Sequence, residues 1–194
     1  MSTLFQPFAT QLDFETGKLN PEGKVIIRHL SDMKGMYLDE GEFENQLEKN
    51  PLIYEVYNVV VPETMPHIQH CVTILHPGKV GKEYFMTKGH YHEVLDRAEI
   101  YFCLKGKGEL LMQTKDGEFS SLEMVPGTVA YVAPEWAHRT VNTGEEPFVF
   151  FAAYPGDAGH DYGGIETEGF VKALVEQNDK PTYIENPCYI QAVK

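Results

Sequence analysis

Three histidines and one glutamate stand at spacings that suit a metal site. His90 and His92 are two residues apart, Glu99 follows shortly after them, and His138 lies far downstream. Neutral imidazole nitrogens and a carboxylate oxygen bind Mn, Fe, Ni, Zn or Cu, and four protein ligands around an octahedral ion leave two positions open. We therefore predict that these four residues bind one transition metal ion that a small molecule can reach.

The expected strands explain how these distant residues would meet. Side chains at i and i+2 of a strand lie on the same face, so one strand would carry both histidines of the close pair. Glu99 begins a second strand-like run, in which Glu99, Tyr101 and Cys103 share a face. We expect His138 on a third strand, after the break at Pro134.

A histidine in a chain of this size is more often a surface or core residue than a ligand. We expect such ordinary roles for four of the eight histidines: His29, His67, His70 and His76. A matched pair of imidazoles on one strand face is costly to bury unless both are satisfied, which favours metal binding for the close pair.

Motifs around the predicted ligands resemble the two motifs of the cupin superfamily. The first resembles the run 89–92 with Glu99 and Gly106, and the second resembles Gly127, Pro134, His138 and Asn142, with Trp136 where many cupins have glycine. Longer runs are similar to the cupin-type phosphoglucose isomerases of archaea. These runs are 30–33, 84–92, 95–101, 104–108, 136–142 and 154–162, so the resemblance covers nearly the whole chain.

The strand pattern agrees with the fold that this resemblance implies. Runs rich in Val, Ile, Phe and Tyr occupy 54–61, 71–75, 99–105, 109–114, 128–132 and 147–154. Turn pairs separate them at Pro77-Gly78, Asp116-Gly117, Pro126-Gly127 and Thr143-Gly144. Many short strands indicate a sandwich or barrel. We expect an all-β cupin jelly-roll barrel with additional N- and C-terminal strands and few short helices.

The two ends of the chain are less regular. We expect a short strand at 24–30 and a helix at 39–49, which Asn50-Pro51 ends because proline disfavours helical backbone before it. Residues 170–177 fit either a helix or the first strand of a hairpin that turns at Asn178-Asp179. We favour the hairpin, whose strands would pair with N-terminal strands or another subunit.

The length of the chain indicates its domain organisation, and its net charge limits the class of partner. A chain of 194 residues buries a sizeable core as one domain, and we divide it into an N-terminal extension packing on the barrel (1–50), a cupin core (51–155) and a C-terminal extension (156–194). A net charge of −13 argues against a nucleic-acid or anionic-membrane partner. That charge would not steer an anionic sugar phosphate inward, so local donors must hold the phosphate.

Cys71, Cys103 and Cys188 are widely spaced and odd in number, which is typical of reduced thiols. The first residues show no basic region followed by an apolar core, and no apolar run approaches membrane-spanning length. We therefore expect a cytoplasmic protein.

The resemblance also implies a function. It implies an enzyme of glycolysis and gluconeogenesis that interconverts glucose 6-phosphate and fructose 6-phosphate. It further implies a homodimer with one divalent transition metal ion per subunit, for which we expect Fe²⁺ ahead of Mn, Ni or Zn. The metal ligands would be His90, His92, Glu99 and His138.

Substrate residues follow from the same resemblance. It implies catalytic roles for Glu99, His160 and Tyr154, with His160 acting on the ring oxygen as the sugar opens. The implied substrate-binding residues are Tyr54, Thr73, Thr87, Gly89, Tyr101, Tyr154 and His160. Gly89 suits close approach of a ligand to the backbone, whereas Lys88 has no such support and is expected to be solvated.

The chemistry leaves one question open. A metal that contacts O1 and O2 would stabilise an enediolate, and a carboxylate near C1 and C2 would carry the proton between them. Glu99 is the available carboxylate, but metal coordination lowers its basicity. Glu99 is therefore either a loosely held ligand that acts as base, or the hydrogen moves as hydride without a base. We favour proton transfer through a cis-enediol.

Two other classes of function remain open at this stage: a metal-dependent cupin oxygenase and a non-catalytic sugar-phosphate-binding cupin. An oxygenase pocket is more often lined with apolar and aromatic side chains, whereas Thr73, Thr87, Tyr54 and Tyr154 favour a phosphorylated, hydroxyl-rich ligand. Isomerisation of mannose 6-phosphate would use the same chemistry and is allowed as a side activity.

Overall fold

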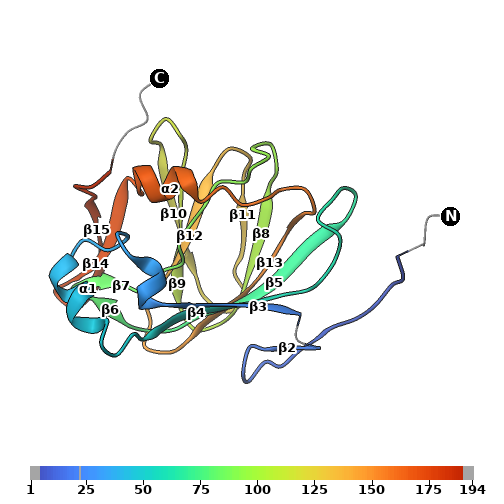
Figure 1. The fold of residues 1–194 in the computed structure, drawn as a ribbon, viewed down its shortest axis with the longest axis horizontal. Helices are drawn as coiled ribbons and strands as arrows, with labels where there is room; N and C mark the ends of the chain where they lie inside the picture. Colours follow the sequence, from blue (N-terminus) through green and yellow to red (C-terminus); the bar gives the residue numbers. More distant parts are fainter. Residues whose placement is uncertain (1–4, 22, 190–194) are drawn as a thin grey trace.

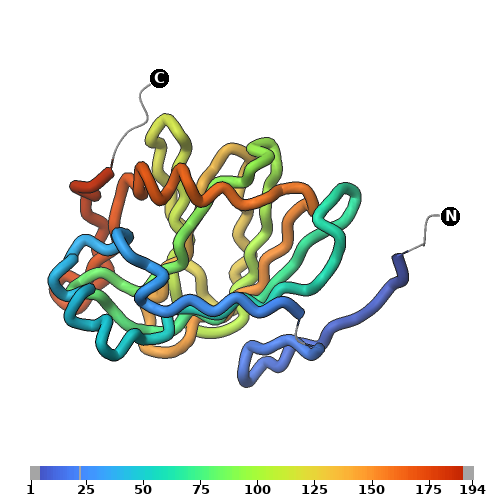
Figure 2. The backbone as a smooth tube through the Cα atoms, viewed as in Figure 1, coloured from blue at the N-terminus to red at the C-terminus, as the bar shows by residue number. Residues whose placement is uncertain are grey.

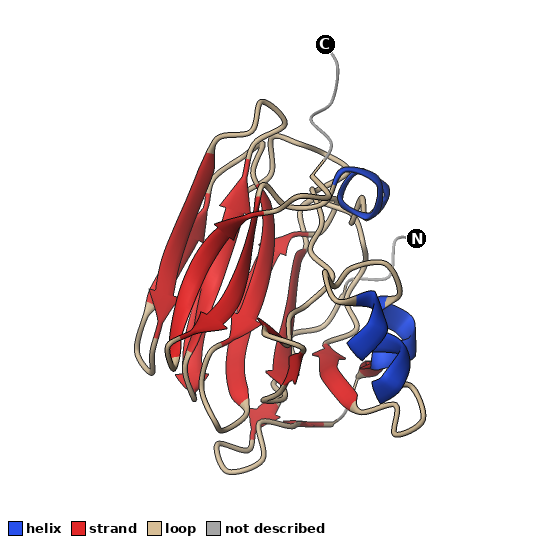
Figure 3. Ribbon diagram, turned by 90° about the vertical axis from the view of Figure 1, so that its left-hand side faces the viewer, coloured by secondary structure: helices blue, strands red, loops and turns tan. Residues whose placement is uncertain are grey.

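Facing β sheets dominate the structure, a computed structural model that describes residues 5–21 and 23–189 (Figures 1 and 3). The larger sheet runs in the order β11 (Val129–Val132), β8 (Glu99–Lys105), β13 (Phe148–Pro155), β5 (Ile68–Leu75), β4 (Leu52–Asn58) and β3 (Lys24–His29). The smaller sheet runs in the order β10 (Phe119–Met124), β9 (Gly108–Gln113) and β12 (Ala137–Asn142). Every pairing in these two sheets is antiparallel, and the architecture is the expected jelly-roll barrel.

Alternation along the strands decides what enters the barrel. On β8, Glu99, Tyr101 and Cys103 are buried, whereas Ile100 and Phe102 between them point outward and are exposed. This confirms the predicted shared face. On the neighbouring strand β11, Ala130 and Val132 are buried, and Val129 and Tyr131 are exposed. One large apolar cluster fills the barrel.

A third sheet closes one end of the barrel. It contains β15 (Lys180–Glu185), β14 (Lys172–Gln177), β7 (Glu83–Tyr84) and β6 (Lys79–Val80), beside helix α1 (Glu40–Gln46) (Figure 1). Asn178 and Asp179 join β14 to β15 with φ of 52° and 58°, which suits a two-residue hairpin turn. The hairpin prediction for the C-terminal stretch is confirmed. Its pairing partner is β7 and not an N-terminal strand.

The N-terminal segment lies outside the barrel. The short strands β1 (Gln11–Leu12) and β2 (Leu19–Asn20) pair with each other below the larger sheet (Figure 2). Leu19 packs there in a second apolar cluster with Tyr57, Val72, Ile74 and Val149. Part of the outer face of the larger sheet is thus covered by the chain's own N-terminal residues.

Helices are few and short, as expected. Helix α1 lies within the predicted range 39–49, and the Asp39 side chain caps it by accepting a hydrogen bond from the Glu42 N–H at 2.9 Å. The other helices are the 3-10 helix η1 (Leu30–Met33) and α2 (Gly163–Glu168). No helix among residues 5–21 and 23–189 is long and apolar enough to cross a membrane.

One local prediction was wrong. The residues around His90 and His92 do not form a regular strand; three isolated bridges hold them instead, pairing Met86 with Val141, His90 with His138 and Tyr91 with Asp161. The backbone is tied to two different partners, because Tyr91 pairs with the chain that follows β13. It stays extended enough to bring both histidines toward one interior.

Candidate active site

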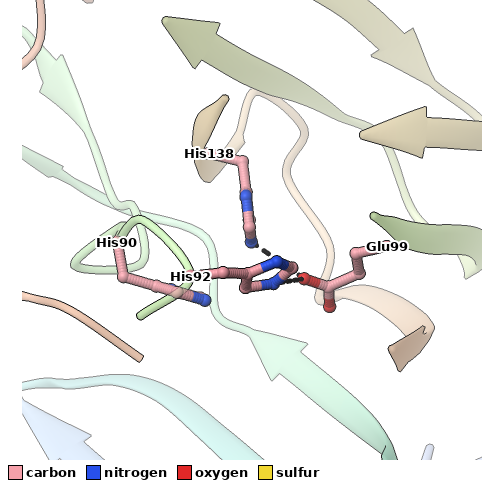
Figure 4. A group of neighbouring side chains, drawn as sticks. All are labelled: His90, His92, Glu99 and His138. Carbon is pink, nitrogen blue, oxygen red and sulfur yellow. Dashed lines mark hydrogen bonds and ion pairs between the residues drawn. The ribbon is translucent and has the colours of Figure 1, made fainter. Parts of the chain in front are cut away.

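Four side chains converge at one end of the barrel. Glu99 comes from β8, His138 from β12, and His90 and His92 from the bridged segment between β7 and β8 (Figure 4). One possible ligand atom from each lies within 4.8 Å of those of the other three. Sequence spacing predicted this grouping, and the His90 to His138 backbone bridge explains how residues so far apart in the chain meet.

Hydrogen bonds to the backbone fix the orientation of two imidazoles. The Nδ1–H of His92 donates to the Arg97 carbonyl at 2.9 Å, and the Nδ1–H of His138 donates to the Trp136 carbonyl at 3.3 Å. Each neutral ring then carries its lone pair on Nε2. This arrangement is usual for metal-bound histidine, where a partner on one nitrogen sets the other as ligand.

The donor atoms need a cation between them. The Nε2 atoms of His92 and His138 lie 3.1 and 2.9 Å from the same Glu99 oxygen, so lone pairs face a carboxylate. His90 Nε2 is buried with no hydrogen-bond partner among the described residues. A buried polar atom without a partner is costly. One divalent ion would satisfy all four side chains, and the donor set therefore fits a transition metal.

Electrostatics favours ionised Glu99 beside neutral His90. Burial opposes ionisation of Glu99, but His138 and His92 outweigh it, and the pKa of this carboxyl lies well below its ordinary value. Burial lowers the pKa of His90 far below its ordinary value, and His138 and His160 add to that effect. Burial opposes protonation of His92, but the hydrogen bond to Glu99 and the charge of that carboxylate outweigh it and raise the pKa of His92. A metal requires a carboxylate and neutral imidazoles, so an ion bound at these atoms would displace the His92 proton.

A pocket of about 410 Å³ opens onto this cluster. The seven residues predicted to bind substrate all line it: Tyr54, Thr73, Thr87, Gly89, Tyr101, Tyr154 and His160. The volume suits a small molecule. The larger sheet supplies Thr73 and the three tyrosines, and the bridged segment supplies Thr87 and Gly89.

Gly89 is required by its surroundings. Its φ is +77°, and a Cβ at this position would lie 2.8 Å from the Phe170 ring and 3.1 Å from the His138 carbonyl oxygen. Glycine at this position permits the left-handed backbone and the close packing against Phe170 and His138, while the residue itself lines the pocket. Close approach of a ligand to this backbone is therefore possible.

Tyr101 and Tyr154 lie beside the four proposed metal ligands. Burial raises the pKa of Tyr101 far above its ordinary value, and the Glu99 carboxylate beside it adds to the effect. Burial likewise raises the pKa of Tyr154. Both phenols stay protonated, so each can donate a hydrogen bond to a substrate oxygen or a carboxylate.

His160 lines the pocket close to the proposed metal ligand His90. Its ring centroid is 4.5 Å from that of His90 and 5.3 Å from that of Tyr154. Burial lowers its pKa, which leaves it neutral near pH 7 and able to accept a proton.

The other residues considered in the sequence analysis are not part of the four-residue cluster. Cys103 is buried in the core as expected. His29, His67, His70 and His76 are not part of the cluster. Lys88 is not solvated: its side chain is largely buried, lines the pocket and forms an ion pair with Glu166 at 3.2 Å.

Arg28, Tyr162 and Asp157 are among the pocket residues that the sequence analysis did not assign to the site. Arg28 lines the pocket from β3, which the period-2 spacing of Lys24, Ile26 and Arg28 would have revealed. Tyr162 stacks on His160 at 6.0 Å and 11°. Asp157 lines the pocket and pairs with Arg97, although the two are 60 residues apart, and no local pattern signals such a contact.

The curated relatives that align with nearly the whole chain are named as one enzyme. A family model described as glucose-6-phosphate isomerase matches residues 27–189. A glucose-6-phosphate isomerase of Thermococcus litoralis is 52% identical over 183 residues, covering 94% of this chain and 96% of the relative. One of Pyrococcus abyssi (strain GE5 / Orsay) is 53% identical over 183 residues, with the same coverage. Among solved structures, an oxalate oxidase aligns over 60% of this chain and 58% of that chain, with a TM-score of 0.49 and 13% identity.

Proposed function

The chain belongs to the glucose-6-phosphate isomerase family, in its cupin-type form, and we propose how its site performs that reaction. The enzyme interconverts glucose 6-phosphate and fructose 6-phosphate, so its substrate is a sugar phosphate. Its cofactor is a divalent metal ion, supported by the cluster of three imidazoles and one carboxylate.

We propose that His90, His92, Glu99 and His138 hold this ion and that the ion is Fe²⁺. The observation that carries the metal site is the convergence of unsatisfied imidazole nitrogens on one carboxylate. The ion would supply Lewis acidity at O1 and O2 of the open-chain sugar. Mn, Ni and Zn suit the same donors, so metal identity is an outcome of the assay below.

We propose that Glu99 carries the proton between C2 and C1 through a cis-enediol. Glu99 is the carboxylate of the cluster, and it is ionised and buried at the pocket wall. Tyr101, on the same face of β8, would donate to Glu99 or to a substrate hydroxyl and so position the proton carrier. A general base within hydrogen-bond reach contributes about 10²–10⁴ to kcat.

Ring opening would use side chains that lie beside the proposed metal ligands. His160 is neutral and adjacent to Tyr154, so His160 would move a proton at the ring oxygen while the phenol of Tyr154 donates to a sugar oxygen. Tyr54, Thr73, Thr87 and the Gly89 N–H would bind the phosphate. These four groups offer hydroxyls and an amide, the donors that phosphate accepts.

We propose that the enzyme is a homodimer. Ile100, Phe102, Val129 and Tyr131 expose a continuous apolar area on the paired strands β8 and β11. Exposed apolar patches of this kind mark association surfaces, and two-fold dimers are the commonest assemblies. Sedimentation that gives the mass of one 22.0 kDa chain at micromolar concentration would contradict this.

Compartment and organisation are part of the same proposal. We propose a cytoplasmic enzyme, supported by three cysteines that form no disulfide in the described part of the chain. We propose that the chain is a single cupin domain with an N-terminal extension (1–50), a cupin core (51–155) and a C-terminal extension (156–194).

One assay tests the central proposal. Fructose 6-phosphate conversion is measured with enzyme stripped by a chelator, and then with Fe²⁺, Mn²⁺, Ni²⁺ or Zn²⁺ restored singly. We expect conversion to stop on stripping and to return, most strongly with Fe²⁺. Undiminished conversion by metal-free enzyme would contradict the metal-dependent mechanism. Restoration by another ion would change only the metal identity.

A further inference from the structure

The edge strand β3 turns cationic side chains into the active-site pocket. Lys24, Ile26 and Arg28 alternate along this strand and line the pocket. Their register partners on β4 are Asn58, Val56 and Tyr54, which line it as well. Paired residues of neighbouring strands lie on the same face, so Arg28 stands directly beside Tyr54.

Arg28 lies close to two phenols of the pocket. Burial raises the pKa of Tyr54 to about 12, and the guanidinium of Arg28 opposes that rise by interacting with the Tyr54 hydroxyl. Burial also raises the pKa of Tyr162, which the charge of Arg28 again opposes. The same Tyr54 hydroxyl lies near the backbone N–H of Lys88. A guanidinium, a phenol and the backbone before Gly89 therefore meet in one part of the pocket.

The charge of Arg28 has no anionic side-chain partner among the residues that the structure describes. Among residues 5–21 and 23–189, Arg28 forms no salt bridge, whereas the pocket cation Lys88 is paired with Glu166. The chain has an excess of acidic residues, with a net charge of −13. Even so, Arg28 lines a pocket without forming an ion pair to any of the described acidic side chains. Guanidinium groups match the geometry of phosphate oxygens and bind them with two donors.

We propose that Arg28 binds the phosphate group of the sugar phosphate, next to the Tyr54 hydroxyl and the Lys88–Gly89 backbone. This inference rests on the proposed function and adds to it the charged group that the phosphate subsite otherwise lacks. Arg28 lies on the edge strand β3 of the larger sheet, in the proposed N-terminal extension (1–50), so this extension would complete the substrate site. The strand thereby selects phosphorylated over neutral sugars.

The phosphate does not react, so Arg28 contributes equally to binding of the ground state and the transition state. Loss of such uniform binding raises KM and leaves kcat nearly unchanged. A hydrogen bond to a charged group contributes about 1.5–3 kcal/mol, which corresponds to roughly a ten- to hundredfold change in KM.

The test compares Arg28→Gln with the wild-type holoenzyme. We expect KM for fructose 6-phosphate and the inhibition constant of inorganic phosphate to rise together by about ten- to hundredfold. We expect kcat and metal content to stay near wild type. Arg28→Lys keeps the charge and should recover part of the affinity. Lys34→Gln removes an exposed cation outside the pocket and should change neither constant.

Two results would overturn the inference: unchanged phosphate inhibition in Arg28→Gln, or a fall in kcat with KM unchanged. Calorimetric titration of inorganic phosphate into both proteins separates this inference from the proposed function. If wild type does not isomerise the sugar but binds phosphate through Arg28, the function fails and the inference stands. If wild type isomerises the sugar and Arg28→Gln binds phosphate equally well, the function stands and the inference fails.

Discussion

The backbone carbonyl of Arg97 accepts a hydrogen bond from Nδ1 of His92 at 2.9 Å. The guanidinium of the same arginine binds both carboxylate oxygens of Asp157, through Nε at 2.9 Å and Nη2 at 2.8 Å. Asp157 precedes His160 in the loop after β13. Arg97 therefore connects His92 to the loop that carries His160, the proposed ring-opening residue. We expect that a substitution in this loop alters the position of the groups around His92.

We expect Asp157→Asn to lower kcat/KM by about ten- to hundredfold, because a small displacement of a positioned group has effects of that size. Metal content should stay near wild type, since the Arg97 carbonyl still holds His92. Asp96 supplies a matched control: it pairs with the same arginine, but its side chain is 75% exposed. Asp96→Asn should behave like wild type. Equal losses in both variants would contradict a positioning role for Asp157.

Arg139 is buried behind the Lys88–Gly89 backbone, which we propose to bind the phosphate. Its Nε and Nη2 donate to the Lys88 carbonyl at 3.2 and 2.6 Å, and its guanidinium stacks 4.4 Å from the Phe170 ring centroid. The Lys88 carbonyl shares a peptide unit with the Gly89 N–H, so Arg139 turns that N–H away from itself and toward the pocket.

We expect Arg139→Met to raise the inhibition constant of inorganic phosphate by about tenfold or more, because an aligned donor is lost. Arg139→Lys should recover part of it. Thermal unfolding and metal content are measured in parallel, since residue 139 follows His138. If Arg139→Met keeps its metal and its wild-type affinity for phosphate, the orienting role is wrong.

Glu83 makes stability depend on pH. Burial raises the pKa of this carboxyl from 4.5 to about 7, although its side chain accepts a hydrogen bond from the Leu38 N–H at 2.9 Å. Between these two values the folded state retains a proton that the unfolded state releases. Stability from this group is therefore full below pH 4.5 and is lost as pH rises through about 7.

We expect Glu83→Gln to remove this dependence, because the amide keeps an acceptor and does not ionise. The unfolding free energy of the variant minus that of wild type should grow by up to roughly 3 kcal/mol between acidic pH and pH 8. Denaturant titrations at several pH values measure it. A difference that is independent of pH would show that Glu83 ionises equally in both states.

Local patterns predicted most of the barrel. Strand β8 has the predicted bounds of 99–105, because its alternation of buried and exposed residues is uninterrupted. The hairpin at Asn178 and Asp179 was predictable from turn chemistry. Strand β4 ends at Asn58, three residues before the predicted end at Val61, because β propensity does not report where a neighbouring strand stops pairing.

Other features depend on contacts that no window of sequence contains. His90 is held by a bridge to a residue 48 positions away, and the predicted strand was wrong because the segment changes partner at Tyr91. The ion pair of Lys88 with Glu166 and that of Arg97 with Asp157 arise from loops packing together. Such pairings follow from tertiary structure, so periodicity and propensity miss them.

Glu99→Gln tests whether the cluster carboxylate is the proton carrier. The amide keeps the size of the side chain and one ligand oxygen but removes the base. Loss of a general base should lower kcat by about 10²–10⁴. Metal content must be measured with activity, because loss of the ion would have the same effect. The other three proposed ligands, His90, His92 and His138, are unchanged in this variant.

Isomerisation in deuterated water then distinguishes proton transfer from hydride transfer. Proton transfer through a cis-enediol places solvent deuterium in the product in at least a fraction of turnovers, because a proton held on the Glu99 carboxylate exchanges with water. Hydride transfer leaves the product unlabelled. Suppose metal-replete Glu99→Gln is close to full activity and the wild-type product carries no solvent label. That pair of results would remove Glu99 from the role of base and leave hydride transfer between C2 and C1 as the mechanism.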